Sequence, residues 1–80
     1  MRKYLETLIE EKGFDLDTEL EVEGHIGLTC EMLIDFICTP DMAAYHKSIR
    51  DTLVKIDFHN GDVFHYLKHL AAGMVAACGY

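Results

Sequence analysis

The chain has 80 residues, with 14 Asp and Glu against 7 Lys and Arg, which leaves a formal net charge of −7. This length allows one domain, residues 1–80, because two domains would each be too small to bury a core. Half of the residues are hydrophobic, which excludes a disordered acidic tail, and the acidic balance argues against direct contact with nucleic acid.

No membrane span or secretion signal is expected. The longest weakly polar run, residues 70–80, has 11 residues, whereas a span needs about 20. The first residues lead directly into an amphipathic pattern that contains acids, unlike a signal peptide. Cys30, Cys38 and Cys78 have neither disulfide nor zinc-site spacing, so we expect reduced thiols that pack as small hydrophobic side chains. A cytoplasmic protein is the simplest interpretation.

Residues 2–12 predict a short helix whose apolar face consists of Leu5, Leu8 and Ile9. Gly13 is expected to adopt the left-handed cap conformation, with Phe14 folded back on Ile9.

The charges of this helix oppose its dipole. Arg2 and Lys3 lie at the positive end, and Glu10 and Glu11 lie at the negative end. Each mismatch costs roughly a few tenths of a kcal/mol at a solvated surface. These acids do not stabilise the helix, which leaves another role open for them.

Residues 14–23 change to a period of two. Apolar residues and Thr18 alternate with five acids, Asp15, Asp17, Glu19, Glu21 and Glu23. Strict alternation is typical of a half-buried strand, so we expect one apolar face and one row of carboxylates. An irregular segment, or a helix over residues 16–23, is the competing interpretation. A lone strand needs a backbone partner, which would be the chain around residues 25–28, a copy in a homodimer, or a strand of another protein.

Two helices are predicted after a turn at residues 24–27. Thr29 is a plausible N-cap for a helix over residues 30–38, whose buried face would be Leu33, Phe36 and Ile37. Thr39, Pro40 and Asp41 then start a helix that runs to about Phe58. Its predicted buried stripe is Met42, Tyr45, Ile49, Leu53 and Ile56.

A last helix is predicted from Asp62, as its cap, to about Cys78, because Asn60 and Gly61 interrupt the pattern. Its stripe is Val63, Leu67, Leu70, Met74 and Ala77, and its many small residues favour packing within the chain or, alternatively, self-association. The polar and aromatic residues 57–66 form a second candidate surface, unless they are a capped turn in which Phe58 and Phe64 close the core. The expected fold class is mainly α (α+β), with about four helices and one short acidic extended segment near residues 14–23.

The excess charge lies entirely in the first half of the chain. Residues 1–40 hold 3 basic and 10 acidic residues, whereas residues 41–80 hold 4 of each. Such a field attracts a basic protein and repels nucleic acid and membrane. We therefore expect a small non-enzymatic interaction or regulatory module, with a homodimer as one assembly. Its partner-binding residues would be Asp15, Asp17, Glu19, Glu21 and Glu23.

Two alternatives stay open. His65 and His69 are four apart on the last helix and would both face one metal ion, but a site needs a third ligand and usually a fourth. The row of carboxylates has a spacing close to that of nucleic-acid phosphates, which would suit an inhibitor that mimics nucleic acid. No phosphate loop, nucleophile elbow or cysteine signature is present, so we assign no catalytic residue, metal ligand or cofactor.

Overall fold

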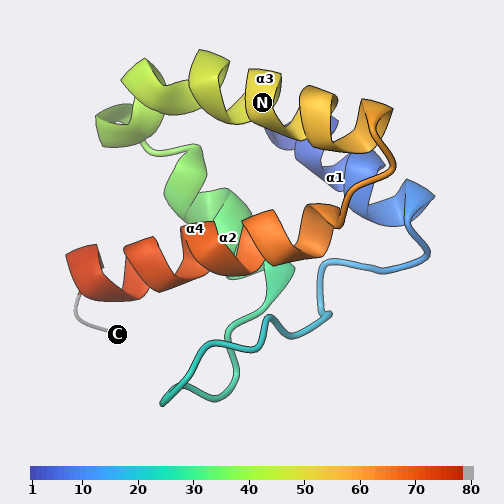
Figure 1. The fold of residues 1–80 in the computed structure, drawn as a ribbon. Coiled ribbons are helices and arrows are strands. Elements are labelled where there is room, and N and C mark those ends of the chain that lie inside the picture. Colours follow the sequence, from blue (N-terminus) through green and yellow to red (C-terminus); the bar gives the residue numbers. More distant parts are fainter. Residues whose placement is uncertain (79–80) are drawn as a thin grey trace.

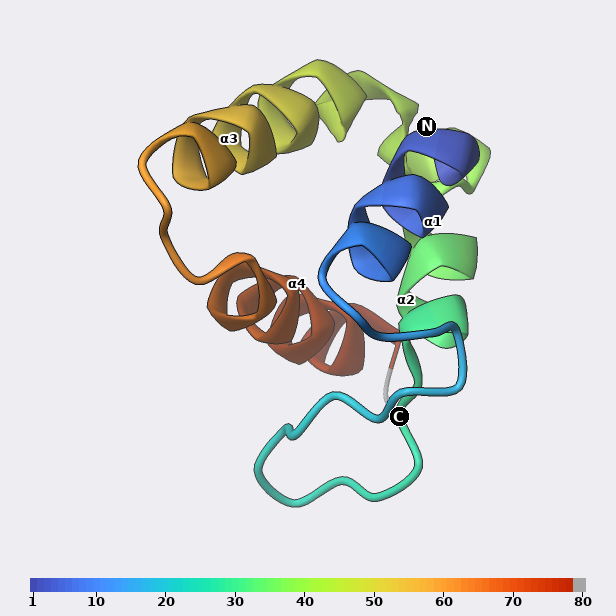
Figure 2. The same ribbon diagram turned by 90° about the vertical axis from the view of Figure 1, so that its right-hand side faces the viewer.

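The computed structural model describes residues 1–78. Its elements are α1 (Arg2–Glu11), α2 (Cys30–Ile37), the 3-10 helix η1 (Pro40–Tyr45), α3 (His46–Phe58) and α4 (Val63–Cys78). The helix α2 packs against α1, α4 and η1, and α3 packs against η1 and α4 (Figure 1). The chain between α1 and α2 runs outside the helices, at the end of the molecule opposite α3 (Figure 2). The expected small, mainly helical fold is confirmed.

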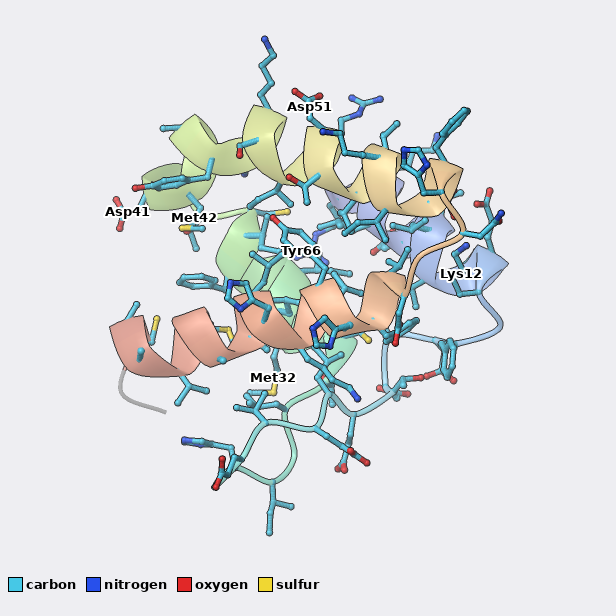
Figure 3. The ribbon with its side chains drawn as sticks, viewed as in Figure 1. Lys12, Met32, Asp41, Met42, Asp51 and Tyr66 are labelled. Atoms are coloured by element: carbon cyan, nitrogen blue, oxygen red, sulfur yellow. The ribbon has the colours of Figure 1, made fainter. Side chains whose placement is uncertain are left out.

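The core is made by one apolar face from each α-helix. The predicted face of α1 is confirmed, because Leu5, Leu8 and Ile9 are all buried. The most deeply buried side chains of α3 and α4 are Leu53, Leu67, Ala71 and Met74. Tyr66 lies between α4 and α3 (Figure 3) and packs against the same core.

The backbone at the end of α1 adopts the predicted left-handed cap. Gly13 has a φ of 84°, in the left-handed region. The amide of Gly13 donates to the Glu10 carbonyl, and the amide of Phe14 donates to the Ile9 carbonyl. This pair of bonds is a Schellman cap. The ring of Phe14 lies against Phe64, with 4.3 Å between the centroids, and so covers the start of α4.

The end of α3 has the same cap. The amide of Asn60 donates to the Asp57 carbonyl, and the amide of Gly61 donates to the Ile56 carbonyl. Asn60 takes the left-handed position, with a φ of 57°. A Cβ added to Gly61 would lie 2.9 Å from Cγ2 of Ile56, so the tight return toward α4 favours glycine at this position.

The prediction of one helix from Pro40 to Phe58 is wrong. A 3-10 helix ends at Tyr45, and a separate α-helix begins at His46. The Nε2 atom of His46 lies 2.6 Å from the carbonyl oxygen of Ile37, which ties the first turn of α3 to the end of α2. Tyr45 is exposed as a result, although the helical stripe placed it in the core.

The prediction of a strand over residues 14–23 is also wrong. The segment makes only isolated bridges within residues 1–78, between Glu19 and Thr29 and between Val22 and His25. A turn begins at Asp15, where the Asp17 amide and the Thr18 hydroxyl both donate to the Asp15 carboxylate. This turn bends the chain at the point where a regular strand would begin.

The backbone of this segment nevertheless finds its partners within the chain, as one of the three expected solutions requires. The amide of Leu20 donates to Leu28 over 2.7 Å, and the amide of Cys30 donates to Thr18 over 2.9 Å. The amide of Glu31 donates to the carbonyl of Leu16. These bonds join the segment to the residues before α2 and the start of that helix.

The helix α2 begins as predicted, because the Thr29 hydroxyl accepts a hydrogen bond from the Met32 amide. The three cysteines differ in their surroundings. Cys30 is buried, as expected, Cys38 is half-buried, and Cys78 is exposed, so the expectation that all three pack in the core is wrong for Cys78. Burial raises the pKa of the Cys30 thiol, which keeps it protonated and unreactive near neutral pH. Across residues 1–78, no helix combines the length and the apolar character needed to cross a membrane.

Candidate functional site

The most distinctive surface is the segment 14–29, named here the acidic loop. Along residues 15–23, exposed acidic side chains alternate with more buried side chains, as the sequence pattern predicts, although these residues form no strand. Leu20 and Leu28 are 2% and 3% exposed, and they anchor the loop to the helices. Leu16 and Val22 are half-buried, while all five predicted binding acids are exposed: Asp15, Asp17, Glu19, Glu21 and Glu23. The period of two therefore predicted burial correctly and secondary structure incorrectly.

One of these five carboxylates has a structural role. Asp15 accepts hydrogen bonds from the Asp17 amide, at 2.9 Å, and from the Thr18 hydroxyl, at 3.2 Å. The Asp15 amide in turn donates to the Thr18 hydroxyl oxygen. Asp15 is therefore engaged in the turn that begins the loop. The other four carboxylates make no side-chain hydrogen bond or ion pair with any residue of 1–78.

The nearby basic residues do not neutralise the acidic loop. Arg2 pairs with Asp35 on α2 and with Glu6 on α1. Lys12, which precedes the loop, pairs with Asp57 at the end of α3 (Figure 3). The bases closest to the loop in sequence thus join helices to one another. Glu19, Glu21 and Glu23 have no ion-pair partner within residues 1–78.

An exposed apolar side chain, Ile26, lies in the turn at residues 24–27 of the acidic loop. Ile26 is 97% exposed, and it lies between Gly24 and Gly27, whose φ values of 81° and 84° belong to the left-handed region. These glycines let the chain reverse while Ile26 points into solvent. Residues 24–27 were predicted only as a turn, and the exposed Ile26 was not predicted. The signal was present in the sequence, as one large apolar residue flanked by two turn glycines.

The histidines of α4 do not form a metal site with their neighbours. Asp62 caps α4 as predicted, because its carboxylate accepts a bond from the His65 amide. The rings of His69 and Tyr66 are stacked, with 6.4 Å between the centroids. No three His, Cys, Asp or Glu side chains among residues 1–78 are grouped closely enough to hold an ion. A third ligand for His65 and His69 is therefore lacking in the part of the chain described.

The turn between α3 and α4 differs from its expected form. Phe64 is half-buried against the core, but Phe58 is 81% exposed and makes an edge-to-face contact with His59. The small residues of α4 also differ from the expectation of packing within the chain. Ala71 is buried, whereas the others are exposed, namely Ala72, Gly73, Ala76 and Ala77.

No protein family model, curated protein or solved structure matches this chain.

Proposed function

We propose that this protein is a small non-enzymatic interaction module that docks a basic protein partner through the acidic loop. The binding residues would be the five predicted acids, Asp15, Asp17, Glu19, Glu21 and Glu23. The observation that carries the proposal is the exposure of all five, with four of them free of any partner within residues 1–78. A cytoplasmic location remains part of the proposal.

The energetics of such a contact favour recognition by charge. Unpaired carboxylates on one loop attract a basic surface over about 8 Å at physiological ionic strength. They accelerate encounter more than they raise affinity. Asp15 contributes its charge while it holds the turn. The other four carboxylates are free to meet Lys or Arg side chains directly.

The position of Ile26 suits the centre of such an interface. Affinity at protein interfaces comes mainly from a few apolar anchors that become fully desolvated, surrounded by polar contacts. Ile26 is nearly fully exposed at the turn, between Glu23 and the end of the loop. A shallow apolar depression ringed by basic residues is therefore the partner surface that fits best.

Neither alternative has an observation in its favour. A metal site on His65 and His69 lacks a third ligand within residues 1–78. Mimicry of nucleic acid needs a regular row of charges, whereas the turn at Asp15–Thr18 and the left-handed glycines interrupt the row. Binding of a basic protein needs only that the charges be exposed together.

The test is affinity capture with two variants of equal net charge. One variant carries Glu19→Lys and Glu21→Lys in the acidic loop. The control carries Asp41→Lys and Asp51→Lys, on η1 and α3, which lie far from the loop (Figure 3). Proteins captured from a lysate by the unchanged chain are quantified by mass spectrometry for each variant.

We expect the loop variant to lose at least about tenfold of a basic captured protein, because reversed charges repel it. The control should retain that protein. If the loop variant retains it, or if both variants lose it equally, the acidic loop is not the docking surface.

A further inference from the structure

A second surface lies away from the tip of the acidic loop (Figure 2). It is a groove of about 410 Å³ between α1 and α3. Its apolar lining comes from both helices and consists of Tyr4, Leu8, Val54 and Phe58. Val54 and Phe58 are 51% and 81% exposed, although they lie four residues apart on one face of α3. Two adjacent large apolar side chains left in water form an exposed apolar patch, a feature found at interaction surfaces.

The two helices that border the groove run in the same direction. The guanidinium of Arg50 lies 5.1 Å from the ring centroid of Tyr4, near the start of α1. Lys12, at the end of α1, pairs with Asp57, at the end of α3. Residue 4 is therefore level with residue 50, and residue 12 with residue 57. Their first turns share one end of the groove, and their last turns share the other.

The groove is consequently polarised. Lys3 and Arg50 are exposed beyond the groove lining, toward the end where the helices begin. Glu11 and Asp57 line the groove where the helices end. Neither helix carries an acid in its first turn, and α1 has no base in its last turn, although α3 has Lys55 there. The bases of this face therefore lie near the positive ends of the helix dipoles and the acids near the negative ends, which costs the isolated chain some stability.

The charges on this face match those of a second copy of the chain that lies against it in the antiparallel orientation. A two-fold axis that lies in the face, perpendicular to both helices, sets each helix antiparallel to its own copy. The basic end of one groove then meets the acidic end of the other, and opposite helix dipoles also meet. A symmetric contact of this kind uses the same surface on both chains. The levels of the helices bring residue 11 opposite residue 3 of the copy, and residue 57 opposite residue 50.

We propose that the α1–α3 groove is the contact surface of a homodimer. In this dimer a second copy lies face to face and antiparallel, and Glu11 faces the partner's Lys3, two charged side chains of this face that take part in no ion pair within residues 1–78. The two Phe58 side chains and the other apolar lining residues fill the space between the grooves. The tip of the acidic loop stays free, because it lies at the other end of the molecule from the groove (Figures 1 and 2). The dimer therefore goes beyond the proposed function and does not depend on it.

The small contact area between the two α1–α3 faces predicts a weak dimer. The helices have 10 and 13 residues, so they are about 15 and 20 Å long. Such a face is smaller than the roughly 800 Å² per partner of a standard interface. We therefore expect a weak dimer that dissociates on dilution.

The first experiment is sedimentation equilibrium of the untagged chain, with concentrations up to about 1 mM, where even a millimolar dissociation constant gives substantial dimer. We expect a monomer–dimer equilibrium that Phe58→Ser weakens at least about tenfold. Ile26→Ser, which removes an even more exposed apolar side chain from the acidic loop, should leave it unchanged. A monomer at every concentration overturns the proposal. A dimer that tolerates Phe58→Ser also overturns it, and would direct attention to the exposed small residues of α4.

Charge reversal on α1 supplies the second experiment. Lys3 and Glu11 take part in no ion pair within residues 1–78. Lys3→Glu or Glu11→Lys alone would place like charges together at two equivalent points of the dimer and weaken it at least about fivefold. The double variant restores opposite charges and should return the dissociation constant to within about threefold of its original value.

The single variants also show whether a change in dimerisation comes from the proposed ion pair, from a destabilised fold or from the altered net charge. Each brings α1 into agreement with its dipole, so neither should lower the thermal unfolding temperature. Glu11→Lys also reduces the overall repulsion between two chains of charge −7. If it strengthens the dimer as much as the matched control Glu21→Lys does, only net charge is at work and the proposed pairing is wrong.

Discussion

Replacing Leu20 by Ala tests whether the irregular acidic loop is part of the folded core. Leu20 is 2% exposed and belongs to the same core cluster as Leu5, Leu33 and Leu67. The change removes three buried carbon groups, each worth about 0.8 kcal/mol, and leaves a cavity in addition. We therefore expect the free energy of unfolding to fall by about 2–4 kcal/mol. A chain of this length has a total stability of about 4–12 kcal/mol, so the loss is a large fraction of it.

The measurement is urea unfolding followed by circular dichroism, with Ile26→Ala as the matched control. Ile26 belongs to the same loop but is 97% exposed, so its truncation should change the free energy of unfolding by less than about 0.5 kcal/mol. Equal unfolding midpoints for the two variants would refute the reasoning. They would mean that Leu20 is not anchored, and that the loop moves independently of the helices.

Two further predictions concern the N-terminal cap of α4 and the pH dependence of stability above pH 8. Asp62→Ala removes the carboxylate that accepts the His65 amide, and should lower the free energy of unfolding by about 1 kcal/mol, whereas Asp62→Asn should retain most of it. Burial raises the pKa of the Cys30 thiol above its ordinary value of 9.0, so the folded state holds the proton more tightly than the unfolded state does. The stabilisation is fully present below pH 9 and is lost as the pH rises toward the folded pKa, with a slope of at most about 1.4 kcal/mol per pH unit. Urea unfolding between pH 8 and 10 should show this slope, and Cys30→Ala should reduce it; an identical slope in the variant would contradict the assignment.

Helix caps, which depend on a few neighbouring residues, were predicted well. The left-handed Gly13, the Thr29 cap and the Asp62 cap all occur where the sequence places them. The reason is that a cap joins a side chain, or a backbone conformation, to amides and carbonyls within about five residues. Such geometry depends little on the rest of the fold.

The strand prediction failed because alternation reports which side chains are buried, and not whether the backbone is regular. Leu20 and Leu28 are buried and the acids are exposed, as a strand would require. The turn at Asp15–Thr18 and the glycines at 24 and 27 nevertheless leave only isolated bridges in the described chain. Regular pairing needs a continuous extended partner, which this short segment does not have.

The sequence by itself determined most of the helical segments, most of the side chains that form the core, and that the excess negative charge lies in residues 1–40. These properties follow from local periodicity and from composition. Only the tertiary structure decided which apolar side chains stay uncovered. Phe58 and Val54 face the side of α3 toward α1, but α1 and α3 leave a groove between them at this level. Exposure of this kind depends on how helices far apart in the sequence pack together, and no local pattern encodes it.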